Sequence, residues 1–262
     1  MCLSHNLPAN LVPDTYQIIT RAGEILLSSF GKISVAVSYK DNGSPVTEAD
    51  KASEQYLKKE LSRLVPHASF LGEETGLTAH EGDYCWVVDP LDGTANFIHG
   101  IPYFCISVAL THHGCPIFAM IYQPTTEDLF SAVRGGGAFF NGRQLQVTPV
   151  SEAVSPMLGM PYSRNREQEK FLEGVGKLGY SQRYFGCAAL ELGYLACGYI
   201  DGFVSFKLKW WDVAAGSLLV TEAGGVITDG EGKPLMEGFE TVIAGTPQVH
   251  DQVYSIYCES NG

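Results

Sequence analysis

The 262-residue sequence has no run of apolar residues long enough to cross a membrane as a helix, which takes about 18 residues. Its N-terminus has no basic segment followed by an apolar stretch, so a signal peptide is not expected. Basic residues are scarce, since 17 Lys and Arg oppose 29 Asp and Glu and give a net charge of −12. An acidic surface repels nucleic acid and anionic membranes. We therefore expect a cytoplasmic protein with neither partner.

Paired cysteines are also missing. The seven cysteines form an odd set without a C-x-x-C pair, and no histidine stands at zinc-ligand spacing from them. This pattern argues against a disulfide framework and against a structural zinc site built on cysteines. We expect most of these thiols to be buried and reduced.

Low-complexity tracts, internal repeats and long linkers are absent from the sequence. Hydrophobic residues make up 45% of the chain, which is enough for a substantial core. We expect one compact unit with two halves, residues 1–150 and residues 151–262, joined by a hinge near Pro149 to Pro161. The first half would carry most of the candidate metal ligands.

The pattern of apolar residues alternates between helical and strand periodicity. It predicts helices over residues 15–30, 49–64, 188–196 and 213–223, with Thr47 as the N-cap of the second. It predicts strands over residues 69–72, 85–88, 104–111, 116–122, 129–133 and 202–207. The mixture indicates a layered α/β fold.

The segment WVVDPLDGTANF, residues 86–97, joins an apolar strand to two carboxylates. Because proline cannot donate to a ladder, we expect the chain to leave the sheet at Pro90 and to present Asp89 and Asp92 at the strand's carboxyl end. Two carboxylates in one turn can share hard cations. Gly93 lets the backbone approach a ligand, and Thr94 adds a hydroxyl group beside the next N–H groups.

Three further acidic elements occur elsewhere in the chain. Glu73 follows an apolar strand in LGEET, Asp212 stands at the start of a predicted helix in WDVAAG, and Asp50 lies in VTEAD. Each carboxylate alone is typical of a turn or of a helix N-cap. Together with Asp89 and Asp92 they supply the oxygen ligands that Mg²⁺ takes.

The segments GEE, WVVDPLDGTANF and WDVAAG resemble the metal-binding motifs of the inositol monophosphatase family. The resemblance extends through VTEAD and FGCAALELGYLACGYIDGF and covers nearly the whole chain. It implies an αβαβα sandwich of the type shared with fructose bisphosphatases. It also implies a magnesium-dependent, lithium-sensitive phosphatase that acts on a small phosphorylated metabolite, and a possible homodimer.

Carried over to this sequence, the resemblance implies two to three Mg²⁺ ions. Glu73, Asp89 and the backbone carbonyl of Leu91 would hold the first ion. Asp89, Asp92 and Asp212 would hold the second, and a third, weaker ion would use Glu73, which thereby also counts among the catalytic residues.

The family resemblance also assigns catalytic and substrate-binding positions. Thr94, with Asp50 behind it, would orient the attacking water. The N–H groups of Gly93 and Thr94 would hold the phosphate. The remaining substrate-binding positions are Asp92, Ala188, Ser205 and Asp212.

The choice of substrate stays open at this point. Inositol 1-phosphate is the leading candidate, but the family commonly has a glutamate that contacts inositol hydroxyls seven residues before Asp212, where this chain has Ser205. Lys207, Lys209 and the loop YKDNGSPVTEAD favour a 3'(2'),5'-bisphosphate nucleotidase, and histidinol phosphate is a further alternative. A non-catalytic sensor of a phosphorylated metabolite and a structural cation-binding protein are competing classes.

Overall fold

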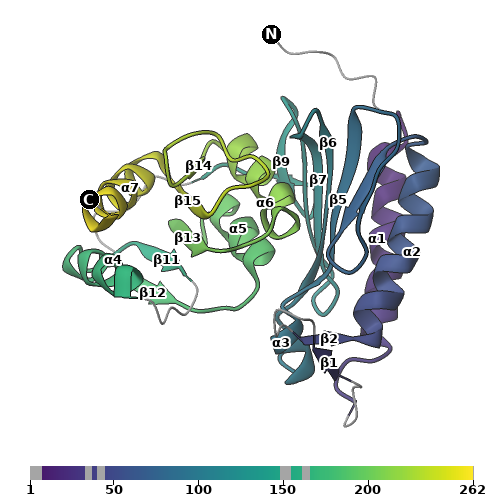
Figure 1. Ribbon diagram of the computed structural model, residues 1–262, viewed down its shortest axis with the longest axis horizontal. Coiled ribbons are helices and arrows are strands. Elements are labelled where there is room, and N and C mark those ends of the chain that lie inside the picture. The colour runs from purple at the N-terminus through teal and green to yellow at the C-terminus, as the bar shows by residue number, and fades with distance from the viewer. Residues whose placement is uncertain (1–7, 33–36, 40–44, 148–154, 161–165, 262) are drawn as a thin grey trace.

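The computed structural model describes residues 8–32, 37–39, 45–147, 155–160 and 166–261. Figure 1 shows layers of helices and sheets that alternate across the molecule: α1 and α2, a large sheet, α5 and α6, a smaller sheet, then α4 and α7. This arrangement confirms the expected αβαβα sandwich.

The large sheet has eight strands in the order β10-β9-β8-β7-β6-β5-β3-β4. Neighbouring strands are antiparallel except β3 and β5, which run parallel. This sheet and the outer helices consist of α1 (Leu11–Leu27), α2 (Glu48–Leu64), β3 (Ser69–Gly72), β4 (Gly76–Thr78), β5 (Tyr84–Asp92), β6 (Cys105–His112), β7 (Cys115–Gln123), β8 (Asp128–Val133), β9 (Gly137–Phe140) and β10 (Arg143–Gln144). A small hairpin, β1 (Val37–Tyr39) and β2 (Pro45–Thr47), and the short helix α3 (Thr94–Ile98) lie beside the end of the large sheet (Figure 1).

The smaller sheet has five strands in the order β12-β11-β13-β15-β14. This part of the chain consists of β11 (Met157–Gly159), α4 (Arg166–Lys177), β12 (Ser181–Arg183), α5 (Ala188–Ala196), β13 (Gly202–Phe206), α6 (Trp210–Glu222), β14 (Val226–Asp229), β15 (Thr241–Gly245) and α7 (Pro247–Asn261). The helices α5 and α6 lie between the two sheets and therefore pack against both.

Both faces of the large sheet are buried. In β6, Ile106 and Val108 pack in the core beneath α1 and α2, whereas Cys105 and Ala109 pack in the core shared with α5 and α6. Successive side chains of a strand point to opposite faces. A strand with two buried faces is therefore apolar at nearly every position, as β6 and β7 are.

Several predicted elements are confirmed. The helix over residues 188–196 and the strand over residues 69–72 coincide with α5 and β3. Thr47 caps α2, since its Oγ1 accepts a hydrogen bond from the N–H of Ala49 at 3.2 Å. Helix α1 begins at Leu11, four residues earlier than predicted. Pro13 is tolerated in this first turn because an N–H there has no intrahelical partner.

The prediction that the chain leaves the sheet at Pro90 is wrong. Strand β5 continues to Asp92, which pairs with Cys105 after a shift in register between Asp89 and Asp92. Proline is compatible with such a bulge because the extra residues make no ladder hydrogen bond.

The expected start of the helix at Asp212 also needs correction. Helix α6 begins at Trp210, so Asp212 is its third residue rather than its N-cap. Its Oδ2 reaches back and accepts a hydrogen bond from the N–H of Lys209 at 2.7 Å.

The expected hinge lies partly outside the described residues, so the division into residues 1–150 and 151–262 stays a prediction. Among the helices that the structure describes, none is long and apolar enough to cross a membrane.

Candidate active site

The bulge in β5 brings two carboxylates to one place. In a regular strand, residues three positions apart point to opposite faces of the sheet. The register shift between Asp89 and Asp92 removes this restriction. After burial and the charge of Glu73, the negative charge of Asp92 is a further cause that raises the pKa of Asp89. Asp89 is only 1% exposed, and its Oδ1 accepts a hydrogen bond from the N–H of Leu91 at 2.9 Å.

Two more carboxylates reach the same site from other elements. Glu73 follows β3, and its N–H donates to the carbonyl of Val88 in the neighbouring strand at 3.2 Å. Asp212 comes from the first turn of α6. Burial, followed by the negative charges of Glu73, Asp92 and Asp212, raises the pKa of Asp89 well above its ordinary value.

Burial and neighbouring negative charges also raise the pKa values of Asp92 and Asp212. Burial, together with the charge of Glu73, raises the pKa of Asp92 to about 6. Burial, together with the charges of Asp92 and Glu73, raises the pKa of Asp212 to about 8. Hydrogen bonds from the N–H groups of Ala189 and Lys209 oppose these shifts only in part. These carboxylates, of which Asp89 is buried and Asp92 and Asp212 are half-buried, repel one another, and a cation between them would relieve this repulsion.

The donor atoms at this site fit magnesium. They are carboxylate oxygens together with the carbonyl oxygen of Leu91, which accepts from Thr94 Oγ1 at 3.0 Å and keeps a second lone pair. Mg²⁺ prefers such oxygen ligands, completed by water and by substrate phosphate. The kinds of donor atom present therefore suit Mg²⁺.

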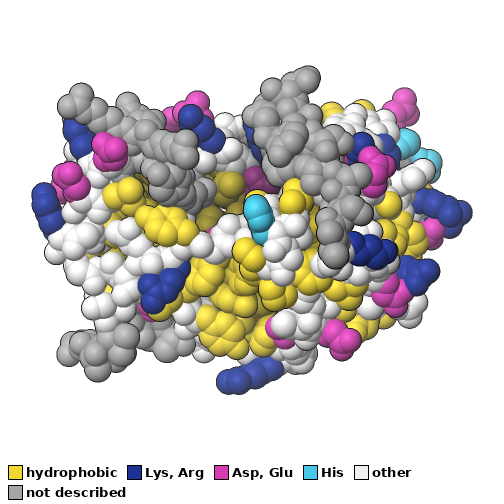
Figure 2. Space-filling model, turned by 90° about the horizontal axis from the view of Figure 1, so that it is seen from below, with side chains coloured by type: hydrophobic (Ala, Val, Ile, Leu, Met, Phe, Trp, Pro, Cys, Tyr) yellow, Lys and Arg dark blue, Asp and Glu magenta, His cyan; other side chains and the backbone are white. Residues whose placement is uncertain are grey.

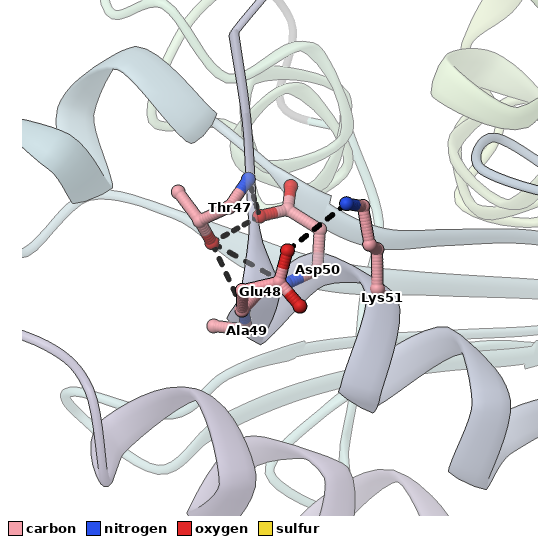
Figure 3. A network of polar contacts seen from close by, with 5 residues as sticks. All are labelled: Thr47, Glu48, Ala49, Asp50 and Lys51. Carbon is pink, nitrogen blue, oxygen red and sulfur yellow. Dashed lines mark hydrogen bonds and ion pairs between the residues drawn. The ribbon is translucent and has the colours of Figure 1, made fainter. Parts of the chain in front are cut away.

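A polar network joins the start of α2 to the end of β5. Thr47 donates to Asp50 Oδ2 from its N–H at 2.8 Å and also from its hydroxyl group (Figure 3). The other carboxylate oxygen, Oδ1 of Asp50, accepts from Thr94 Oγ1 at 3.4 Å. Asp50 is 1% exposed, and burial raises its pKa despite the bonds from Thr47.

Some of the predicted substrate-binding residues lie beside the carboxylates, whereas Ser205 has no described hydrogen bond to them. Asp92 Oδ2 accepts a hydrogen bond from the N–H of Ala189 at 2.6 Å, so Ala188, the first residue of α5, lies beside the site. Gly93 has a φ of 92°, and its N–H donates to the carboxylate of Asp92. Ser205 is buried on β13, and none of the hydrogen bonds described for the structure joins it to the carboxylates.

The structure adds supporting residues that the sequence analysis missed. Glu54 is fully buried, and its carboxylate accepts from the N–H groups of Glu74 and Thr75, both at 2.8 Å. It thereby holds the loop that carries Glu73. The sequence feature that could have identified Glu54 is its position four residues after Asp50, because residues at this spacing lie on the same face of a helix.

A second supporting residue, Asn96, connects the two halves of the chain. Its Nδ2 donates to the carbonyl oxygens of Tyr103 at 2.8 Å and Phe185 at 2.9 Å. The second contact ties α3 to the segment that leads into α5. Asn96 lies in the segment WVVDPLDGTANF, but the sequence assigned it no role, because its partners are backbone carbonyl groups.

Comparison with known proteins gives consistent matches over nearly the whole chain. Residues 9–261 match the model of the inositol monophosphatase family. An inositol-1-monophosphatase of Rhizobium meliloti is 40% identical over 244 residues, which cover 89% of this chain and 90% of that protein. The Nus factor SuhB of Pseudomonas aeruginosa is 40% identical over 220 residues and covers 79% and 81%. The crystal structure of the suppressor protein suhB from Bartonella henselae superposes with a TM-score of 0.88 at 34% identity, covering 95% and 98%.

Proposed function

Because the chain belongs to the inositol monophosphatase family, we propose that it hydrolyses inositol 1-phosphate to inositol and phosphate with the help of Mg²⁺. As a member of this family it is a phosphoric monoester hydrolase. The observation that supports the metal-dependent mechanism most directly is the group of mutually repelling carboxylates, buried or half-buried, at the end of β5.

The family resemblance assigns the cations to particular residues. Glu73, Asp89 and the carbonyl oxygen of Leu91 would hold the first Mg²⁺, and Asp89, Asp92 and Asp212 the second. A third, weaker ion would use Glu73. When bound, Mg²⁺ lowers the pKa of a coordinated water and neutralises the charge that develops on the leaving oxygen.

Thr94 and Asp50 are arranged to hold a proton of the attacking water. The hydroxyl group of Thr94 has two acceptors within reach, the carbonyl of Leu91 and Oδ1 of Asp50. When Thr94 donates to Asp50, its own oxygen lone pairs are free to accept from a water molecule. Asp50 is fixed by Thr47, so it orients the hydroxyl group of Thr94 rather than following it.

The phosphate would bind against the start of α3. The N–H groups of Gly93 and Thr94 lie at the N-terminus of this short helix, directly after Asp92. A side chain at position 93 would lie 3.0 Å from the carbonyl of Tyr103 and would need an unfavourable φ, so glycine is required there. Glycine leaves the backbone open to a phosphate oxygen.

The substrate assignment rests on relatives that are named inositol-1-monophosphatase. One difference from the family affects this substrate assignment: Ser205 stands where the family commonly has a glutamate. Loss of one hydrogen bond to a charged group costs about 1.5–3 kcal/mol of recognition. That is enough to change the preference of the enzyme among phosphate esters without abolishing catalysis.

The test compares kcat/KM for phosphate release from inositol 1-phosphate, 3'-phosphoadenosine 5'-phosphate and histidinol phosphate at saturating Mg²⁺. We expect inositol 1-phosphate to have the highest value. A higher value for the nucleotide or for histidinol phosphate would overturn the substrate assignment, while leaving the phosphatase reaction intact.

Inhibition by lithium and a homodimer are part of the same proposal. Figure 2 shows a broad group of hydrophobic side chains on one face of the molecule, as is common where subunits associate. Light scattering after gel filtration should give a molecular mass twice the 28.4 kDa of the single chain.

Inhibition by lithium has its own test. Addition of LiCl, with KCl as the control, should lower the rate of phosphate release.

A further inference from the structure

Two histidines and an aspartate lie together at the opposite end of β5 from the carboxylate site. His112 ends β6, His113 follows it in the turn to β7, and Asp83 directly precedes β5. Asp83 and Asp89 are six residues apart in sequence, which corresponds to about 20 Å along a strand. This cluster is therefore separate from the proposed catalytic centre.

The three side chains are close enough to share one ion. One potential ligand atom of each residue lies within 4.8 Å of those of the other two. The imidazole rings of His112 and His113 have their centroids 4.2 Å apart, and His113 Nδ1 lies 3.6 Å from Asp83 Oδ1. Ligands at about 2.0–2.2 Å from one metal ion lie at most about 4.4 Å from one another, so the side chains would have to move closer together to bind the ion.

The backbone brings these residues together. Consecutive residues of a regular strand point to opposite faces, so two adjacent histidines would normally be separated. Here His113 has a φ of 49° and Gly114 a φ of 78°, as in the tight turns that join two antiparallel strands. The N–H of His113 also donates to the carbonyl of Asp83 at 2.9 Å, which connects the turn to the start of β5.

The ligand atoms of this cluster suit a different kind of metal ion from the one proposed for the catalytic site. Two imidazole nitrogens and one carboxylate oxygen suit borderline transition-metal ions such as Zn²⁺. Mg²⁺ prefers an all-oxygen shell and would not compete strongly for imidazole. The ion pair between His113 and Asp83 does not by itself explain the arrangement, because their side chains are 65% and 63% exposed and such pairs stabilise a protein little.

We propose that Asp83, His112 and His113 form a binding site for Zn²⁺ that is distinct from the magnesium site. The ion would have three protein ligands and water in the remaining coordination position. It would connect the beginning of β5 to the β6–β7 hairpin. No sequence pattern indicated this site, because Asp83 is far from the two histidines along the chain.

The test measures Zn²⁺ binding by isothermal titration calorimetry on the full chain at millimolar Mg²⁺, so that the catalytic carboxylates are occupied. We expect one Zn²⁺ per chain, and an affinity that falls about 10-fold or more in both His113→Ala and Asp83→Asn. His80→Ala, which removes another exposed histidine, and Cys115→Ser, which removes a thiol of the same hairpin, are the matched controls. Both controls should bind Zn²⁺ as the wild type does.

A second measurement covers the case in which a variant folds poorly. Anomalous diffraction at the zinc absorption edge from a Zn²⁺-soaked crystal of the wild type should show a peak between Asp83, His112 and His113. The proposal would be overturned by any of three results: absence of that peak, no Zn²⁺ binding at millimolar Mg²⁺, or an unchanged affinity in a folded His113→Ala variant. Loss of binding in Cys115→Ser alone would also overturn it, because the ion would then be bound through the thiol.

Discussion

The backbone N–H of Ala189 donates a 2.6 Å hydrogen bond to Oδ2 of Asp92, although the two residues are 97 positions apart in sequence. Asp92 ends β5 of the large sheet, and Ala189 lies in the first turn of α5. One carboxylate oxygen of Asp92 is therefore held by the second half of the chain. In the proposed metal site, the same carboxylate would bind a cation together with Asp89 and Asp212.

The hydroxyl group of Thr94 gives a first prediction. Thr94→Ala should lower kcat about 100-fold or more with little change in KM, because the proton of the attacking water loses its acceptor. Thr94→Ser keeps the hydroxyl group and should retain most of the activity. Steady-state kinetics of phosphate release measures both variants. Equal losses in the two variants would exclude a role for the hydroxyl group.

The buried side chain of Glu54 gives a second prediction. Glu54→Ala should lower the free energy of unfolding by about 2 kcal/mol, because the N–H groups of Glu74 and Thr75 lose their acceptor. It should also weaken activation by Mg²⁺, since the loop that carries Glu73 is no longer held. Urea unfolding and the Mg²⁺ dependence of the rate are the two measurements.

Glu48→Ala is the matched control, because Glu48 lies in the same helix and its side chain is 72% exposed. It should change neither quantity appreciably. A Glu54→Ala variant that resembled Glu48→Ala in both measurements would contradict the supporting role of Glu54.

The raised pKa values give a third prediction, which concerns the metal-free protein. The pKa of Asp212 is about 8 and that of Asp92 about 6 in the folded state, above the value of about 3.9 for an unfolded aspartate. The folded state therefore binds more protons than the unfolded state, and the contribution of these groups to stability is complete below about pH 4 and is lost as the pH rises to about 8. Urea midpoints measured in EDTA should fall over this range.

Two comparisons make the pH prediction specific. Saturating Mg²⁺ should restore stability near pH 8, because the cation compensates the ionised carboxylates. Asp212→Asn should remove the part of the fall above about pH 6, whereas Glu48→Gln should leave the profile unchanged. A metal-free profile that rises from pH 4 to pH 8 would show that repulsion among these carboxylates is not significant.

The sequence predicted the layers of helices and sheets, and the physical reasons are local. Apolar periodicity located α5 and β3, and hydrogen-bonding side chains located the start of α2 at Thr47. The motifs around Asp89 and Asp212 identified carboxylates that the structure brings close to one another, because each motif joins an apolar element to a carboxylate within a few residues. The structure places these motifs together, as the family resemblance implied.

What the sequence missed depends on contacts between distant segments. The bulge after Asp89 follows from pairing with β6 and cannot be inferred from Pro90 alone. The hydrogen bonds of Asn96 end on backbone carbonyl groups, one of them in a segment about ninety positions away. The cluster of Asp83, His112 and His113 arises from a turn geometry that brings adjacent histidines together.

The most direct test of the metal-dependent reaction is phosphate release by Asp89→Asn at saturating Mg²⁺, with circular dichroism to verify the fold. We expect a loss of activity of about 100-fold or more, because one ligand shared by both cations is weakened. We also expect the metal-free variant to be at least as stable as the wild type, since a repelling, buried charge is removed. Near-normal turnover by the folded variant would contradict the proposal that Asp89 bridges two magnesium ions.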